Sequence, residues 1–209
     1  MDTKKHWETI YRTKPTSEVS WFQPEAKKSL ELIRRVAPER GAPIVDVGGG
    51  ASVLADDLLV AGYTDITVLD LARSALDSAR ARLGAAASER VQWLEADVRT
   101  AQLAAARYAV WHDRAVFHFL TEAEDRARYV AQVSQAVRPG GYVIVATFAD
   151  DGPTRCSGLP VHRYSTEALH DEFGSEFRLV ASERENHETP GGEIQAFIYC
   201  LCRWDGPAR

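Results

Sequence analysis

The chain has 209 residues, of which 45% are hydrophobic, and a formal net charge of −5. This length can bury one sizeable core and is short of what two full domains usually need, so we expect one domain over residues 1–209. The absence of a Lys/Arg cluster argues against nucleic-acid binding. No signal peptide is evident and no apolar run reaches the ~18 residues of a membrane-spanning helix, so we expect a cytoplasmic protein without a membrane partner.

The cysteines Cys156, Cys200 and Cys202 match no common zinc-site spacing and are too few for a disulfide framework. Cys200 and Cys202 lie two residues apart on one predicted strand and therefore on one face. A shared soft ligand with Cys156 is conceivable there, but ordinary core packing is the simpler interpretation. We expect reduced thiols and no metal site.

The chain begins with two predicted helices, over residues 4–13 and 24–36, joined by an irregular link. We expect residues 1–38 to form a helical lid over a ligand cleft. The next segment, 44–47, is a short β-branched strand that ends at glycines, and a helix is predicted to follow over 52–61.

This strand and helix pattern then repeats along the chain. Strands are predicted over 65–70, 91–97, 108–113 and 141–148, and helices over 73–83 and 123–137. Strands separated by helical crossovers form a parallel sheet with helices on both faces, and ligands bind at the carboxyl ends of its strands. Residues 40–150 are therefore expected to hold the ligand.

The pattern changes after residue 150. An irregular loop over 150–164 is followed by a helix capped by Ser165, and segments 177–183 and 195–202 predict an antiparallel hairpin. We expect residues 151–209 to supply a substrate loop, a helix and this hairpin. The complete prediction is an α/β, doubly wound, Rossmann-like fold with a seven-stranded sheet, mostly parallel with a C-terminal antiparallel hairpin.

The glycines 48–50 directly follow the first strand, where a tight turn lets the backbone approach a ligand closely. Gly48 and Gly50 match the first two glycines of the dinucleotide-binding pattern, but Val53 stands where the third would be. The motif alone therefore fits NAD nearly as well as S-adenosylmethionine (SAM).

Acidic residues at the ends of three successive strands separate these two cofactors. Asp70 ends the second strand, where a carboxylate accepts hydrogen bonds from ribose hydroxyls in both kinds of site. Asp46 and Asp97 lie at the ends of the first and third strands. SAM carries a sulfonium and an ammonium but no phosphate, so it tolerates carboxylates that would repel a pyrophosphate. The sequence therefore favours SAM.

With these motifs in this order, residues 40–150 resemble the core of class I SAM-dependent methyltransferases. The resemblance implies that SAM is the cofactor, that Asp70 binds its ribose, and that Leu71 packs on adenine. Gly49 departs from many members, which have Cys or Ala there. The expected cofactor-binding residues are Trp21, Asp46, Gly48, Gly49, Gly50, Asp70, Leu71, Asp97, Val98 and Asp113.

Residues 111–120 cross the loop where members of this family meet the transferable methyl group. His118 is our first candidate for a general base, because imidazole titrates near neutral pH and the flanking Phe117 and Phe119 would exclude water. A local packing role for His118 is the competing interpretation. Asp113 is the second catalytic candidate, and His112 is expected to make a structural hydrogen bond.

The loop over 150–164 is dense in reactive and polar side chains, which is typical of functional loops. Most of its residues would equally suit a plain surface loop. The expected acceptor-contacting residues, here and elsewhere, are Tyr11, Phe117, His118, Cys156, Arg163 and Tyr164.

Aromatic residues mark the predicted lid. Trp7 and Tyr11 lie one helical turn apart, and Trp21 follows the link. An aromatic face over the sulfonium would gain about 0.5–2 kcal/mol, whereas a hydrophobic staple that docks the leader is the alternative. The leader is also similar, more loosely, to small bacterial methyltransferases of the thiopurine and tellurite-resistance groups.

That similarity implies a small soft acceptor. We therefore predict a monomeric methyltransferase that transfers a methyl group from SAM to a thiol, a chalcogen species or a similar small molecule, with S-adenosylhomocysteine as the second product. A protein lysine N-methyltransferase and a non-catalytic SAM-binding or NAD-binding module are the alternatives.

Overall fold

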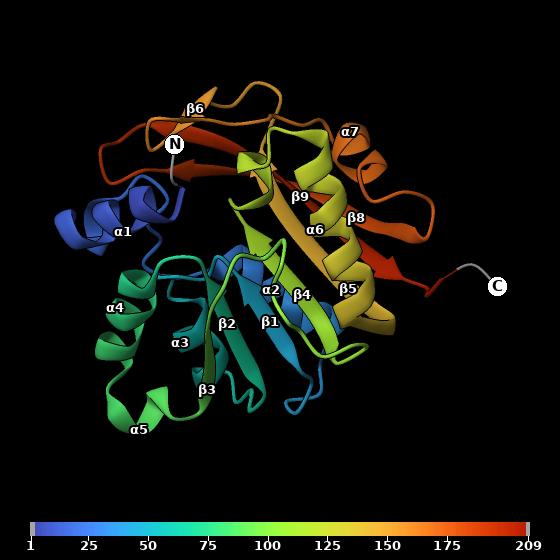
Figure 1. Ribbon diagram of the computed structural model, residues 1–209, viewed down its shortest axis with the longest axis horizontal. Helices are drawn as coiled ribbons and strands as arrows, with labels where there is room; N and C mark the ends of the chain where they lie inside the picture. The colour runs from blue at the N-terminus through green and yellow to red at the C-terminus, as the bar shows by residue number, and fades with distance from the viewer. Residues whose placement is uncertain (1–2, 208–209) are drawn as a thin grey trace.

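The computed structural model describes residues 3–207, and its seven main strands form one sheet in the order β3-β2-β1-β4-β5-β9-β8 (Figure 1). β1 to β5 pair with one another in parallel, and β9 is antiparallel to both β5 and β8. The predicted Rossmann-like sheet with its C-terminal hairpin is confirmed, and the last strand lies between the fifth and the eighth. The strands are β1 (Ile44–Val47), β2 (Ile66–Asp70), β3 (Val91–Glu95), β4 (Tyr108–Arg114), β5 (Val137–Phe148), β8 (Phe177–Glu188) and β9 (Ile194–Trp204).

Two hydrophobic cores cover the two faces of this sheet. Every residue of β1 and β2 is buried, as expected for parallel strands with helices on both sides. One face packs on α2 (Lys27–Val36) and α3 (Leu54–Val60), and the other packs on α6 (Ala123–Ala136). In Figure 1, α6 lies in front of β4 and β5, and α2 lies behind them.

The leader divides into two parts with different environments. α1 (Thr3–Thr13) has no buried residue, whereas α2 buries Leu32 and Ile33 in the core. Residues 3–23 therefore take the covering position that the sequence predicted for the whole leader, because α1 is only partly buried whereas α2 packs into the core. Met1 of the predicted lid lies outside the described residues.

α1 is held against the core by its polar side chains. The Glu8 carboxylate accepts a hydrogen bond from the backbone N–H of Arg73, 2.7 Å away, at the start of α4 (Arg73–Leu83). Ala72, the residue before α4, has no side chain that can cap it, so Glu8 supplies the missing cap from another helix. Lys4 adds an ion pair with Glu95 at 2.6 Å.

The segments that differ from the sequence prediction are short or polar. The loop over 150–164 contains a small hairpin, β6 (Arg155–Cys156) and β7 (Leu159–Pro160). β8 continues to Glu188 because its polar residues pair with β9 in the sheet. The other short elements are η1 (Thr16–Glu18), α5 (Ala85–Ser88), η2 (Phe117–Phe119) and α7 (Thr166–Asp171), the last capped by Ser165 as predicted. Within residues 3–207, no helix has the length and apolar character needed to span a bilayer.

Candidate active site

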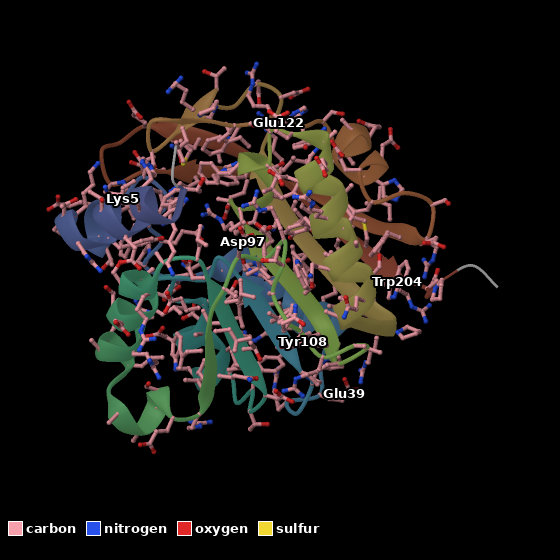
Figure 2. All side chains as sticks on the ribbon, in the orientation of Figure 1. Lys5, Glu39, Asp97, Tyr108, Glu122 and Trp204 are labelled. Atoms are coloured by element: carbon pink, nitrogen blue, oxygen red, sulfur yellow. The ribbon has the colours of Figure 1, made fainter. Side chains whose placement is uncertain are left out.

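A cavity of about 510 Å³ lies at the carboxyl ends of the parallel strands, between the sheet and α1. Figure 2 places Asp97 near this edge of the sheet, away from Tyr108 and Glu39 at the opposite edge. The sheet thus brings together, in one wall, side chains from several separate strand ends. The predicted site residues that line the cavity are Tyr11, Trp21, Gly48, Asp70, Leu71, Asp97, Val98 and Cys156.

The glycine loop after β1 has no room for side chains. Gly48 has a φ of +65°, and a Cβ added there would lie 1.9 Å from Cγ2 of Val116. At Gly49 a Cβ would lie 2.4 Å from Oδ2 of Asp46. The loop therefore needs glycine for close approach, and at Gly48 also for its backbone conformation.

Asp70 occupies the end of β2 and is 7% exposed. Its Oδ1 accepts a hydrogen bond from the backbone N–H of Ala72 at 2.7 Å. Burial, with a smaller contribution from the nearby Asp46, raises the pKa of Asp70 to about 7. The group is thus a buried carboxylate at the cavity wall that gains from a hydrogen-bond donor on a ligand.

Asp97 also lines the cavity but is already engaged. Arg99 contacts it with several donors, the shortest at 2.6 Å, and also pairs with Asp125 at 2.8 Å. The hydrogen bonds from Arg99 hold the pKa of Asp97 below its usual value. Arg99 thus joins Asp97 and Asp125 in one charged cluster. Sequence spacing gave no sign of this cluster, because Asp125 lies on α6.

Four aromatic side chains, Trp7, Tyr11, Trp21 and Phe119, form one wall of the cavity, which we call the aromatic wall. Trp7 lies 5.1 Å from Phe119 and 5.7 Å from Trp21 between ring centroids, and Tyr11 lies 6.1 Å from Trp21. These edge-to-face contacts stabilise the position of the leader beside the cavity. The wall is suited to exclude water and to contact either a cationic or an aromatic ligand.

Arg114 is a cavity residue that sequence reasoning did not select. Its side chain is 9% exposed and donates to the hydroxyl of Tyr199 at 3.0 Å and to Glu185 at 3.3 Å. Its position at the end of β4 was the available signal, but the adjacent aromatic run drew attention to His118 instead. Arg114 brings a guanidinium, paired with Glu185, to the wall of the cavity.

His118 and Asp113 lie outside the cavity lining. His118 is fully buried, its Nδ1 accepts from the Phe148 backbone N–H at 3.3 Å, and burial lowers its pKa to about 3. Asp113 accepts from the backbone N–H groups of Val116 and Phe117 and from the Tyr129 hydroxyl. Burial raises the pKa of Asp113 to about 6. Asp113 therefore fixes the loop after β4 through the backbone of Val116 and Phe117, and His118 ties the same loop to the end of β5 at Phe148.

We therefore expect His118→Asn to keep turnover within about threefold of the wild-type value, since a general base contributes 10²–10⁴-fold. Asparagine retains an acceptor for the Phe148 N–H, which limits the loss of stability. Steady-state kinetics together with a SAM titration would check this. A drop in turnover of about 100-fold with unchanged SAM affinity would restore His118 as a base.

The remaining predicted acceptor residues have separate environments. Phe117 packs against Tyr129 in the core, Arg163 donates to the Gly152 carbonyl at the surface, and the Tyr164 hydroxyl donates to Glu172. Of the loop residues in this group, Cys156 lines the cavity, and burial raises the pKa of its thiol to about 11. Cys156 is therefore a neutral wall residue at physiological pH.

Comparison with known proteins identifies the family. Residues 44–141 match the family described as a methyltransferase domain. The chain is 31% identical over 183 residues to a ubiquinone biosynthesis O-methyltransferase of Aromatoleum aromaticum. The aligned residues make up 87% of this chain and 68% of that protein. The chain belongs to the class I SAM-dependent methyltransferases. This methyltransferase is also 28% identical to the Paracidovorax citrulli protein of the same name, over 87% of this chain and 67% of that protein.

Solved structures share the fold of this methyltransferase at low identity. A Burkholderia thailandensis 1,6-didemethyltoxoflavin-N1-methyltransferase with bound S-adenosylhomocysteine has a TM-score of 0.74 at 21% identity, over 96% of this chain and 86% of that one. A SAM-dependent methyltransferase from Anabaena variabilis has a TM-score of 0.74 at 13% identity, over 98% of this chain and 96% of that one. These structures show that the fold is shared, and membership of the family gives SAM as the cofactor of this enzyme.

Proposed function

We propose that this methyltransferase modifies a small, largely apolar molecule, a thiol or an acidic phenol, that enters the site already ionised. The observation that carries this proposal is the cavity with its aromatic wall, in which none of the described lining residues is a histidine. The sequence favoured a thiol or chalcogen acceptor. The names of the curated relatives, O-methyltransferases of ubiquinone biosynthesis, add support for an oxygen acceptor.

SAM fits the residues at the cofactor side of the cavity. Asp70 would accept from the ribose hydroxyls, and Leu71 and Val98 would contact adenine. Gly48 leaves the backbone free to meet the ligand. SAM supplies an activated methyl group, so the protein mainly needs to align the acceptor and exclude water.

The size of the cavity supports a compact acceptor. Its volume of about 510 Å³ lies in the range of ~300–1,000 Å³ that is usual for a single drug-sized ligand. SAM by itself is a drug-sized ligand, so only a small part of the cavity volume is left for the acceptor. α1 lines the cavity and is tied to α4 through Glu8, which leaves less room for a lysine on a folded protein than for a small molecule and makes protein methylation the weaker alternative.

Arg114 would help to bind an anionic nucleophile. Its guanidinium, fixed by Tyr199 and Glu185, lines the cavity beside the space proposed for the acceptor, and the carboxylates of Asp97 and Asp125 in the lining are paired with Arg99. A thiolate or phenolate would form its bond to the methyl carbon while the carbon–sulfur bond of SAM breaks and its electron pair returns to sulfur. No proton moves in this step, so no base is required.

The test is a panel of thiols and phenols of graded pKa, with an amine and a lysine peptide for comparison, followed by product mass and S-adenosylhomocysteine release. We expect thiols or phenols to react, with the pH at half-maximal rate following the pKa of each acceptor. The Asp70→Asn variant, impaired in SAM binding, controls for background methylation. Reaction with the lysine peptide alone, or one pH profile shared by all acceptors, would contradict the proposal.

A further inference from the structure

Beneath the glycine loop, three buried polar side chains from distant parts of the chain form one hydrogen-bond chain. Nδ1 of His112 on β4 lies 2.7 Å from Oδ1 of Asp46 on β1, and Nε2 of His112 lies 2.8 Å from the hydroxyl of Ser29 on α2. The three residues are 2%, 3% and 1% exposed, respectively. Because β1 and β4 are in register at Asp46 and His112, the sheet itself sets the contact between them.

The direction of these hydrogen bonds follows from the carboxylate. As a carboxylate, Asp46 accepts, so Nδ1 of His112 carries the hydrogen and donates the hydrogen bond. Nε2 of a neutral imidazole is then an acceptor, and the Ser29 hydroxyl donates to it. Ser29 thereby selects the tautomer and the ring orientation of His112, which in turn fixes one oxygen of Asp46.

The other oxygen of Asp46 has no hydrogen-bond partner among the described residues, although it is buried. It lies under the glycine loop, 2.4 Å from the position of a Cβ added at Gly49. A second, smaller cavity of about 50 Å³ opens beside it and is lined by Ser29, Asp46 and His112. Gly48 lines this cavity and the main cavity alike.

A buried carboxylate oxygen without a partner is costly and is stabilised by a cationic donor. The amino-acid end of SAM carries such a donor, its ammonium group, and the adjoining cavity is the place proposed above for SAM. We propose that Ser29 and His112 are positioning residues, which hold Asp46 so that its free oxygen receives the ammonium group of SAM. This inference rests on the proposed cofactor placement, and it makes α2 part of cofactor recognition.

The competing explanation is that the hydrogen-bond chain only ties α2 to the sheet. The two explanations differ in which part of the ligand is affected. Methylthioadenosine has the adenosine and the sulfur of SAM but lacks the amino-acid portion. A positioning role therefore changes the affinity for SAM and spares that for methylthioadenosine, whereas a structural role changes neither or both.

The experiment is calorimetric titration of the full chain with SAM and with methylthioadenosine. For Ser29→Ala we expect the Kd for SAM to rise about three- to tenfold, the range for one lost hydrogen bond, with the Kd for methylthioadenosine unchanged within about twofold. His112→Asn and Asp46→Asn should show the same selectivity, with the largest effect for Asp46→Asn. Ser134→Ala is the matched control, because the Ser134 hydroxyl bonds only to the Val130 carbonyl of its own helix.

Equal loss of affinity for both ligands, or unchanged SAM affinity with or without a lower melting temperature, would overturn the positioning role. If His112→Asn fails to fold, Ser29→Ala still decides the question. Ser29→Ala removes a single hydroxyl group from α2, and alanine is well accommodated in a helix. The titrations contain no acceptor. An error in the proposed acceptor class would therefore leave their outcome unchanged, and the acceptor panel would reveal it separately.

Discussion

Asp70→Asn is expected to weaken SAM binding roughly 10- to 100-fold, the equivalent of about 1–3 kcal/mol for lost charge-assisted hydrogen bonds. A carboxylate accepts from two ribose hydroxyls, whereas an amide offers one acceptor and presents donors in place of the second. Oδ1 of the asparagine can still accept from the Ala72 N–H, so the end of β2 keeps its backbone contact. Calorimetric titration with SAM measures the change.

The same substitution is expected to raise the stability of the SAM-free protein above pH 7. Burial raises the pKa of Asp70 to about 7, against about 4 in an unfolded chain. Between these values the folded state binds more protons than the unfolded state, so the free energy of unfolding falls as pH rises from about 4 to 7. Asparagine has no proton to lose, and melting curves of wild type and variant should diverge over this window.

The matched control is Asp77→Asn, the same chemical change at an exposed position on α4. It should leave both SAM affinity and the pH dependence of the melting temperature close to wild type. Unchanged SAM affinity in Asp70→Asn would remove Asp70 from the cofactor site. Parallel melting curves for wild type and Asp70→Asn would show that Asp70 is ionised in the SAM-free protein at pH 4–7.

Gly48→Ala is expected to destabilise the protein by about 2–5 kcal/mol and to abolish measurable SAM binding. The alanine would adopt a φ of +65°, which costs about 1–3 kcal/mol, and its Cβ would overlap Val116, which costs a similar amount. Relief of the overlap would move the backbone that lies between the two cavities. Denaturant unfolding and SAM titration report the two effects.

Two further variants separate the backbone conformation from the overlap. Gly158 has a φ of +77° but open space at its Cβ position, so Gly158→Ala should cost only about 1–2 kcal/mol. In Gly48→Ala/Val116→Ala the overlapping methyl group is gone, and the double variant should be more stable than the sum of the single effects by about 1 kcal/mol or more. Strict additivity would show that Val116 is not the obstacle.

The sequence alone determined the order of the elements and the edge of the sheet where the cavity lies. Short β-branched segments alternate with helical periodicity from Ile44 to Phe148, and this pattern depends only on local spacing. The carboxyl ends of parallel strands must then meet at one edge, which brings Gly48, Asp70 and Asp97 to one cavity. These residues needed no knowledge of packing, because each is the last residue of a strand or lies within two residues after it.

The acceptor side depended on contacts that sequence spacing does not encode. Arg114 ends β4 and His118 follows four residues later, yet the chain turns His118 into the core and leaves Arg114 at the cavity. The direction of each side chain is set by partners far along the chain, Phe148 for His118 and Glu185 with Tyr199 for Arg114.

The tertiary structure also decided how the leader takes part. Glu8 caps α4 and Ser29 supports His112, and each contact joins residues more than 60 positions apart. A local pattern predicts which segments are helices or strands, because backbone hydrogen bonds and side-chain periodicity act over a few residues. Which polar side chain is buried beside which other one is fixed only when the sheet has assembled and its helices have packed, since burial makes each unpaired polar group costly.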